Sequence, residues 1–159
     1  MERHFVEWRD PLFRYLRTLG CRQTLAEEIA QESFFRLHRA LRDGMQVNDA
    51  RAWVFRVARN LCIDNRREQQ RYWSTDRDVQ ELPYSDNAPD PEQQVLDSER
   101  LRLIGEQVMR LPKLQRQCMY LKAQGLRYHE IAAVLDIPMT AAVDCVRRAV
   151  KRLARRFSE

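Results

Sequence analysis

Apolar residues recur at spacings of three and four along most of the chain, and this pattern predicts helices. In the N-terminal segment the recurring residues are Phe5, Trp8, Leu12, Leu16 and Leu19. We expect this helix to restart at Asp10-Pro11, because aspartate caps helices and proline fits a first helical turn. We expect it to end at Gly20, since glycine readily adopts the left-handed conformation found just beyond helices.

Two further helices are expected before residue 72. Thr24 and Glu27 have the spacing of a capping box, which predicts a helix that begins at Thr24 and stops at Gly44. Its expected buried face is Ala26, Ile29, Ala30, Ser33, Leu37 and Leu41. Asp49 is expected to cap the next helix. The expected buried residues of that helix are Trp53 or Val54, Val57, Leu61 and Ile63.

The periodicity is absent from residues 73–94, where Ser, Thr, Asp and Pro predict a flexible acidic linker. It returns in residues 95–159 as four successive stripes. These are Leu101, Ile104, Val108 and Leu111; Leu114, Cys118 and Leu121; Ile131 and Leu135; and Ala142, Val146, Val150, Leu153 and Phe157. No alternating β-pattern competes with them. The predicted fold class is therefore all-α, with two small helical domains, 1–72 and 95–159, joined by the linker.

The second domain contains a predicted helix-turn-helix. A short helix from Tyr128, a turn at Asp136-Ile137-Pro138 and a longer basic helix follow one another. The second helix of such a unit enters the major groove, and flanking basic residues contact phosphates. The residues expected to face DNA are Thr140, Ala141, Val143, Asp144, Arg147, Arg148 and Lys151. A plain helical hairpin is the alternative.

Charge supports a polyanionic partner. The chain has 28 Lys and Arg against 23 Asp and Glu, a net charge of +5. Basic residues concentrate in two runs, 56–71 and 147–156, and a predominantly acidic stretch separates them. Two separated basic patches indicate two contacts with nucleic acid, although either patch alone is also consistent with a solvated helix face.

Several classes of function lack support. No run of 18 apolar residues exists and the N-terminus lacks the apolar core of a secretory signal, so we expect a cytoplasmic protein. Four cysteines lie far apart without metal-ligand spacing, so we expect buried thiols; a redox role has no support. No phosphate-binding glycine loop or Ser/His/Asp set appears. We therefore expect no enzyme, no catalytic residue, no metal and no cofactor.

Four ordered segments together resemble the extracytoplasmic-function sigma factors, and the resemblance covers nearly the whole chain. The segments are 26–37, 52–67, 111–116 and 125–138. The resemblance implies a bacterial sigma factor that binds core RNA polymerase and directs promoter-specific transcription initiation. It also implies that the first domain melts the −10 promoter element and that the second reads the −35 element.

The resemblance also implies site residues and partners. Those expected to contact the coiled coil of the β′ clamp of core polymerase are Glu27, Glu28, Gln31, Glu32 and Phe35. Those expected at the −10 element are Val47, Asn48, Arg56, Arg59, Asn60, Arg66 and Arg67. The loop residues Val47 and Asn48 would help to hold a base flipped from the non-template strand. The β flap, promoter DNA and an anti-sigma factor are further implied partners, and the free chain is expected to be a monomer.

The recognition helix departs from the family pattern. Val143, Asp144 and Cys145 stand where basic or polar residues are usual, and Asp136 stands where glycine is commoner. We therefore expect an unusual −35 preference, or a weaker contact that depends more on DNA shape. Two alternatives stay open. One is a helix-turn-helix repressor or activator that acts without being a polymerase subunit, and the other is a module that works through a protein partner.

Overall fold

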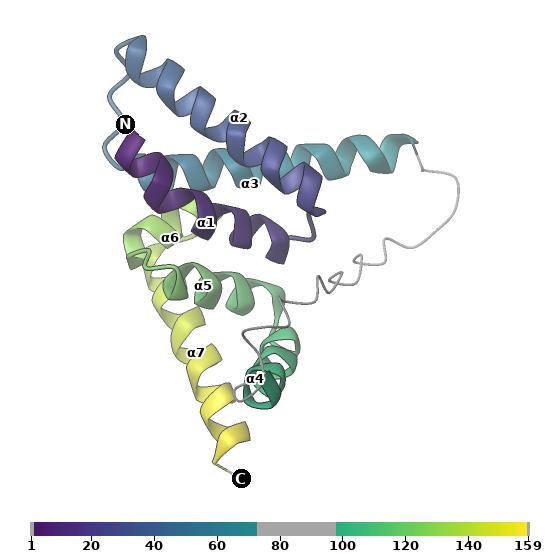
Figure 1. Ribbon diagram of the computed structural model, residues 1–159. Coiled ribbons are helices and arrows are strands. Elements are labelled where there is room, and N and C mark those ends of the chain that lie inside the picture. The colour runs from purple at the N-terminus through teal and green to yellow at the C-terminus, as the bar shows by residue number, and fades with distance from the viewer. Residues whose placement is uncertain (1, 73–97, 159) are drawn as a thin grey trace. The chain divides into compact units, whose positions relative to one another are not determined.

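The computed structural model of the protein describes residues 2–72 and 98–158 (Figure 1). These residues form seven α-helices and no strand, which confirms the all-α prediction. They divide into two units, one of residues 1–85 with 133–136 and the other of residues 86–132 with 137–159. The predicted linker, and the predicted start of the second domain at residue 95, lie outside the described residues.

The first helix of the first unit, α1 (Glu2–Thr18), runs through Pro11 without a break. The predicted restart at Asp10-Pro11 is therefore wrong. Proline removes one backbone hydrogen bond, to the carbonyl four residues earlier. That carbonyl belongs to Glu7, which is exposed, so water can satisfy it. Gly20 follows the helix with a φ of +93°, as expected for a residue that ends it.

The second helix, α2 (Gln23–Arg42), begins without a side-chain cap, so the predicted capping box is wrong. Thr24 lies inside the helix, and Glu27 instead accepts a 3.5 Å hydrogen bond from the Nε2 of Gln23. Five of the six residues of the predicted buried face are confirmed as buried, namely Ala26, Ile29, Ala30, Ser33 and Leu37. Leu41 is wrong, because it stands in the last turn beside exposed residues and is 39% exposed.

The third helix, α3 (Ala50–Tyr72), is capped as predicted: the backbone N–H of Ala52 donates to Oδ1 of Asp49 at 3.1 Å. Its buried stripe is Ala52, Val54, Phe55, Ala58 and Cys62. Of the predicted residues, Val54 is confirmed as buried, whereas Trp53, Val57, Leu61 and Ile63 are only half-buried. Most of the predicted face was therefore displaced by about one residue. Apolar residues surround much of this helix, and α1 and α2 pack on the side that carries the small alanines.

The three helices of this unit pack pairwise. The rings of Tyr15 and Phe55 lie 5.7 Å apart at its centre, and both side chains are fully buried. Burying a side chain of the size of Phe55 contributes about 1.5–3 kcal/mol. The core thus holds α3 firmly against α1 and α2, which leaves the outward faces of α2 and α3 available to partners.

The second unit contains α4 (Ser98–Met109), α5 (Lys113–Ala123) and α7 (Met139–Phe157). Along the chain, α6 (Tyr128–Leu135) comes between the last two, and its residues up to 132 belong to this unit. The longest of these helices, α7, packs on α5 and also on α4. Predicted inward residues that are confirmed as buried are Leu111, Cys118, Leu121, Ile131, Leu135, Ala142, Val146 and Leu153.

Other predicted core residues of this unit are exposed. They are Leu101 at 63%, Ile104 at 36%, Leu114 at 42%, Val150 at 51% and Phe157 at 51%. Ala149, and not its neighbour Val150, occupies the buried stripe of α7, in a cluster with Leu111 and Leu153. Within the described residues, α4 contributes to this cluster through the half-buried Val108, near its C-terminal end. Its earlier turns therefore stay open.

The predicted helix-turn-helix is present. α6 ends at Leu135 and α7 begins at Met139, with Asp136, Ile137 and Pro138 between them. Asp136 has a φ of +54°, which is the left-handed conformation expected where related chains favour glycine. The N–H of Ile137 donates to the carbonyl of Ala132 at 3.1 Å and closes the turn. None of the described helices is long and apolar enough to cross a membrane.

Candidate nucleic-acid and polymerase interfaces

The outward face of α2 carries the residues expected to bind polymerase. Glu27, Glu28, Gln31, Glu32 and Phe35 are all exposed, and their spacing of three to four residues puts them along one side of the helix. The only large apolar member is Phe35, which is 58% exposed. We call these five residues the α2 face.

Adjacent phenylalanines on α2 have opposite environments. The ring of Phe34 packs edge-on against Phe5 with 4.8 Å between centroids, whereas Phe35 points outward among acids. Glu32 forms an ion pair of 2.8 Å with the Nε of Arg36. An exposed aromatic ring flanked by carboxylates suits a partner with an apolar hollow edged by basic groups.

The expected −10 residues on α3 form two neighbouring stripes. Arg56, Asn60 and Arg67 are exposed, while Arg59 and Arg66 are half-buried. The Nε of Arg59 is buried and has no hydrogen-bond partner within the part of the chain that the structure describes. A buried donor without a partner costs free energy in the free protein.

Arg66 is directed toward the turn between α1 and α2. A Cβ atom built on Gly20 would lie 2.5 Å from Nη2 of Arg66, so the guanidinium covers the glycine backbone directly. In the free protein the side chain of Arg66 therefore packs against this turn. Of the expected −10 residues on α3, the exposed Arg56, Asn60 and Arg67 are more directly available to DNA.

The loop before α3 supplies the remaining expected −10 residues. Val47 is half-buried and Asn48 is exposed, directly before the capping residue Asp49. The cap fixes the point at which the loop joins α3, so Asn48 is held near the start of the helix. Its amide group offers both a donor and an acceptor to a base edge.

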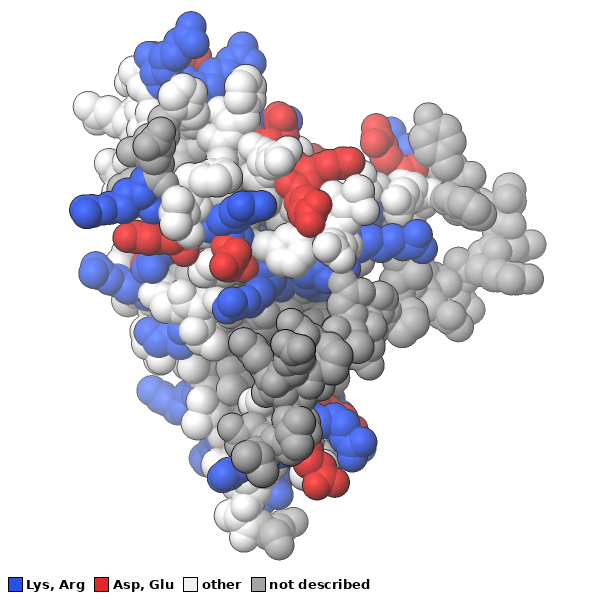
Figure 2. Space-filling model, viewed as in Figure 1, with Lys and Arg blue, Asp and Glu red and all other residues white. Residues whose placement is uncertain are grey.

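On α7, the expected −35 residues lie between Thr140 and Lys151. Thr140, Arg147, Arg148 and Lys151 are exposed, and the others, Ala141, Val143 and Asp144, are half-buried. Figure 2 shows Lys and Arg side chains along the edge of the molecule on which Figure 1 draws α7. Asp144 and Arg148 form an ion pair of 3.0 Å, so they neutralise each other in the free protein. Arg147 and Lys151 therefore carry the net positive charge of this face.

Sequence reasoning missed how the cysteines pair in space. The sulfur atoms of Cys21 and Cys62 lie 2.8 Å apart, and both residues are buried. Burial, together with the charge of Cys145 and a hydrogen bond to it, raises the pKa of the Cys118 thiol to about 12. Each unit thus contains one thiol pair. Cys62 on the buried stripe of α3 was the available signal, but residues 41 apart meet only through the tertiary fold.

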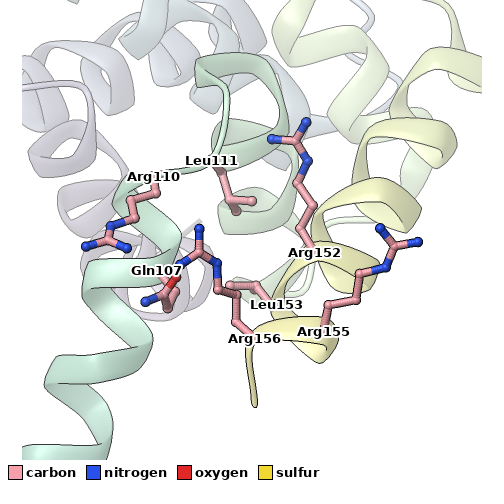
Figure 3. Close-up of a pocket in the computed structure, with 7 residues that line it drawn as sticks. All are labelled: Gln107, Arg110, Leu111, Arg152, Leu153, Arg155 and Arg156. Carbon is pink, nitrogen blue, oxygen red and sulfur yellow. The ribbon is translucent and has the colours of Figure 1, made fainter. Parts of the chain in front are cut away.

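A pocket between α4 and α7 is the other feature that sequence reasoning missed. It is lined by Gln107, Arg110, Leu111, Arg152, Leu153, Arg155 and Arg156. Figure 3 shows the guanidinium groups of Arg110 and Arg155 pointing outward on opposite sides, while that of Arg156 turns toward Gln107. Because these charges diverge, the pocket presents no convergent set of donors for a small ligand.

Comparisons with known proteins give one match within the first unit and three along most of the chain. Residues 5–72 match the family Sigma-70 region 2. Along nearly the whole chain, the protein is similar to three extracytoplasmic-function (ECF) RNA polymerase sigma factors. The likeness is thus to extracytoplasmic-function sigma factors, and Sigma-70 region 2 is matched within the first unit. The exposed α2 face lies within the residues that match Sigma-70 region 2.

The three relatives share about the same identity with this chain. SigE of Mycolicibacterium smegmatis is 29% identical over 91% of this chain and 56% of its own length. SigW of Bacillus subtilis is 29% identical, over 84% and 76% respectively. BldN of Streptomyces coelicolor is 30% identical, over 96% and 58%. The chain thus spans little more than half of the length of SigE and BldN.

A solved structure supports the fold. The sigma factor RpoE of Bartonella quintana, determined in complex with the anti-sigma factor NepR, matches with a TM-score of 0.68. The match covers 97% of this chain and 93% of RpoE at 20% identity. At that level of identity the likeness establishes a shared helical fold.

Proposed function

We propose that the protein is a bacterial sigma factor that binds core RNA polymerase and directs promoter-specific transcription initiation, without catalytic activity of its own. The observation that carries this proposal is the match of residues 5–72 to Sigma-70 region 2, on a unit whose α2 face is exposed. In this proposal residues 1–72 and 95–159 are the two functional domains, joined by residues 73–94, and the protein acts in the cytoplasm.

The α2 face is the proposed contact with the β′ clamp coiled coil. Its carboxylates and its glutamine suit an arginine-rich helix, because arginine forms directed, charge-assisted hydrogen bonds with carboxylates. Phe35 is an exposed aromatic residue at the C-terminal end of the α2 face, and aromatic residues often dominate a binding energy. The rest of the α2 face would then supply orientation and specificity.

The loop before α3 and the outward side of α3 are the proposed −10 contacts. Arginines track a phosphate backbone, while Asn48 and Asn60 offer paired donors and acceptors to unstacked bases. Melting requires a base to leave the stack, which costs a few kcal/mol. Val47 and Asn48 would hold such a base.

The helix-turn-helix is the proposed −35 reader, and the β flap is its proposed partner on the polymerase. The N-terminal half of α7 would enter the major groove, with Arg147 and Lys151 near phosphates. Because Asp144 holds Arg148, base reading by this face is expected to be weaker than its charge suggests. Polymerase would therefore hold the −10 and −35 contacts in position together. Once one contact has formed, the other forms at a high effective concentration, so the affinity for promoter DNA rises.

An anti-sigma factor is a further proposed partner, and the free chain is proposed to be a monomer. The RpoE structure contains the anti-sigma factor NepR, and that chain shares its fold with this one. The surfaces that bind polymerase are exposed here, so an inhibitor that covers them would keep the sigma factor from polymerase.

In-vitro transcription with bacterial core polymerase tests the proposal. The chain is expected to give promoter-specific transcripts from a library of upstream sequences, and core polymerase alone is not. Absence of specific initiation would overturn the sigma factor assignment. A chain that instead bound an operator tightly without polymerase would be a helix-turn-helix repressor or activator.

Phe35→Ala provides the variant for this assay, and Val6→Ala provides its control. Val6 is 74% exposed on α1, outside the α2 face. We expect the first variant to lose transcription and the second to keep it.

A further inference from the structure

The turn between α1 and α2 places one thiol against another on α3. Cys21 and Cys62 are 4% and 3% exposed, and their sulfur atoms are 2.8 Å apart. A disulfide needs about 2.05 Å between sulfur atoms, so they need to approach by less than about 1 Å. No other residue stands between the two sulfur atoms at this distance.

The backbone around Cys21 is already fixed in place. Its N–H donates to the carbonyl of Leu16 at 3.2 Å, and its carbonyl accepts a 3.0 Å hydrogen bond from Nη1 of Arg17. Arg66, one turn after Cys62 on α3, covers the backbone of Gly20. A covalent bond at this point would therefore join two segments that the native fold already holds together.

We propose that Cys21 and Cys62 form a reversible disulfide, so that the first unit carries an oxidative modification site. The oxidant is a peroxide or a small-molecule disulfide. With hydrogen peroxide, one thiolate attacks an oxygen atom, the O–O bond breaks, and a sulfenic acid and water are produced. The second thiol then attacks the sulfenic sulfur, the S–S bond forms, and a second water leaves. Two thiols lose two electrons and two protons in all, and the peroxide is reduced to two waters.

The surroundings of the pair make its oxidation slow and its product durable. The hydrogen bond with Cys62, followed by burial, raises the pKa of the Cys21 thiol, while the positive charges of Arg66 and Arg17 oppose that rise. Little thiolate is present at neutral pH, and the thiolate is the form that reacts. Reaction requires local opening, and once formed the buried disulfide is equally shielded from reductants. The geometry points to a stabilising cross-link and not to a rapid sensor.

The cross-link leaves the proposed interfaces untouched. The α2 face and the exposed arginines of α3 lie outside the Cys21–Cys62 contact, and both cysteines face the core. A disulfide between the turn and α3 restrains the unfolded chain and so raises the stability of the unit. The oxidised protein is therefore expected to keep its surface and to resist unfolding.

The test uses the full chain with Cys118→Ala and Cys145→Ala, which leaves one thiol pair. The reduced protein is incubated with hydrogen peroxide, and in parallel with glutathione disulfide, and is then digested under non-reducing conditions. Mass spectrometry is expected to find the peptides that contain Cys21 and Cys62 linked, with the loss of two hydrogens, and dithiothreitol is expected to separate them. The thermal midpoint of the first unit is expected to rise by about 5 °C or more on oxidation.

Two controls keep the result interpretable. Cys62→Ala in the same background removes the partner, so oxidation is expected to give no intrachain link and no rise of the midpoint. The two-cysteine chain unfolded in urea shows that the oxidant is effective. Intermolecular dimers, sulfinic acid, or two free thiols in the folded protein after the unfolded chain has reacted would each overturn the proposal. None of these readouts depends on transcription.

Discussion

Asp144 and Arg148 form an ion pair of 3.0 Å on the face of α7 that is proposed to read DNA. Both side chains are at least half exposed, so the pair itself contributes about 0.2–1 kcal/mol to stability. Its larger effect is on recognition. An arginine that reads guanine or a phosphate must leave its carboxylate first, and the carboxylate repels the phosphate backbone.

Asp144→Ala is therefore expected to strengthen binding of the chain to duplex DNA several-fold at low salt. One released cation steepens the slope of log affinity against log salt by about 0.9. Fluorescence anisotropy over a salt series measures both quantities. Glu106→Ala is the matched control, because it removes one carboxylate from an i,i+4 pair with Arg102 on α4, away from the reading face. An equal gain in both variants would contradict a specific role for Asp144.

Phe34 and Phe35 allow a second prediction from adjacent residues. Phe35→Ala is expected to weaken binding to core polymerase by about 10- to 100-fold while leaving thermal stability unchanged, because the ring is 58% exposed. Phe34→Ala removes the ring contact with Phe5 and is expected to lower stability, with a smaller direct effect on binding. Biolayer interferometry and thermal unfolding separate the two effects. Unchanged affinity of the Phe35 variant would remove it from the interface.

Local signals in the sequence were reliable where one residue determines the backbone. Asp49 caps α3, and Gly20 ends α1 in the left-handed conformation, both as expected from residue type. The turn at Asp136 was likewise foreseen. The capping box at Thr24 failed, because the chain turns into α2 two residues earlier and the helix is held by packing.

Tertiary packing decided what local signals left open. Apolar residues occur on several sides of α3, so periodicity alone did not choose the stripe that contains Phe55 and Cys62. In α7, the small Ala149 is the residue buried against its neighbours, although Val150 is more hydrophobic. The expected polymerase and −10 residues came from family resemblance, and the expected −35 residues came from the helix-turn-helix pattern. Their exposure is consistent with those roles, while the roles themselves stay predictions.

The glycines give a graded prediction for stability. Gly20→Ala forces an alanine into a left-handed conformation, at a cost of about 1–2 kcal/mol, and adds a clash with Arg66. Gly44→Ala has the same conformational cost, with nothing within 4 Å of the new Cβ. Gly105→Ala lies in α4 with open space around it, and is expected to stabilise that helix by about 0.5–1 kcal/mol.

Urea denaturation monitored by circular dichroism ranks the three glycine variants. The expected order of stability is Gly105→Ala, then Gly44→Ala, then Gly20→Ala. Adding Arg66→Ala to Gly20→Ala is expected to recover part of the loss, since it removes the clash. If Gly20→Ala and Gly44→Ala were equally destabilised, the guanidinium of Arg66 would not be held against the turn.

The thiol pair of the second unit makes stability depend on alkaline pH. Burial first, and then Cys145, raises the pKa of Cys118 from 9.0 to about 12 in the folded state. Above pH 9 the unfolded chain therefore loses this proton while the folded chain still holds it. The stabilising contribution is complete below pH 9 and is lost as pH rises toward about 12. The urea midpoint of the second unit is therefore expected to be lower at about pH 10.5 than at about pH 8.5.

Lysines and tyrosines also titrate in this range, so the informative quantity is a difference between two chains. Cys118→Ala removes this buried thiol and, with it, the interaction with Cys145. Every other titrating group of the chain is kept. The variant is expected to be less stable at pH 8.5, because it leaves a small cavity, and to lose less of its stability on going to pH 10.5. Parallel curves for the two chains would show that the Cys118 proton is not retained on folding. The experiment is run in reductant, so that neither thiol pair is oxidised.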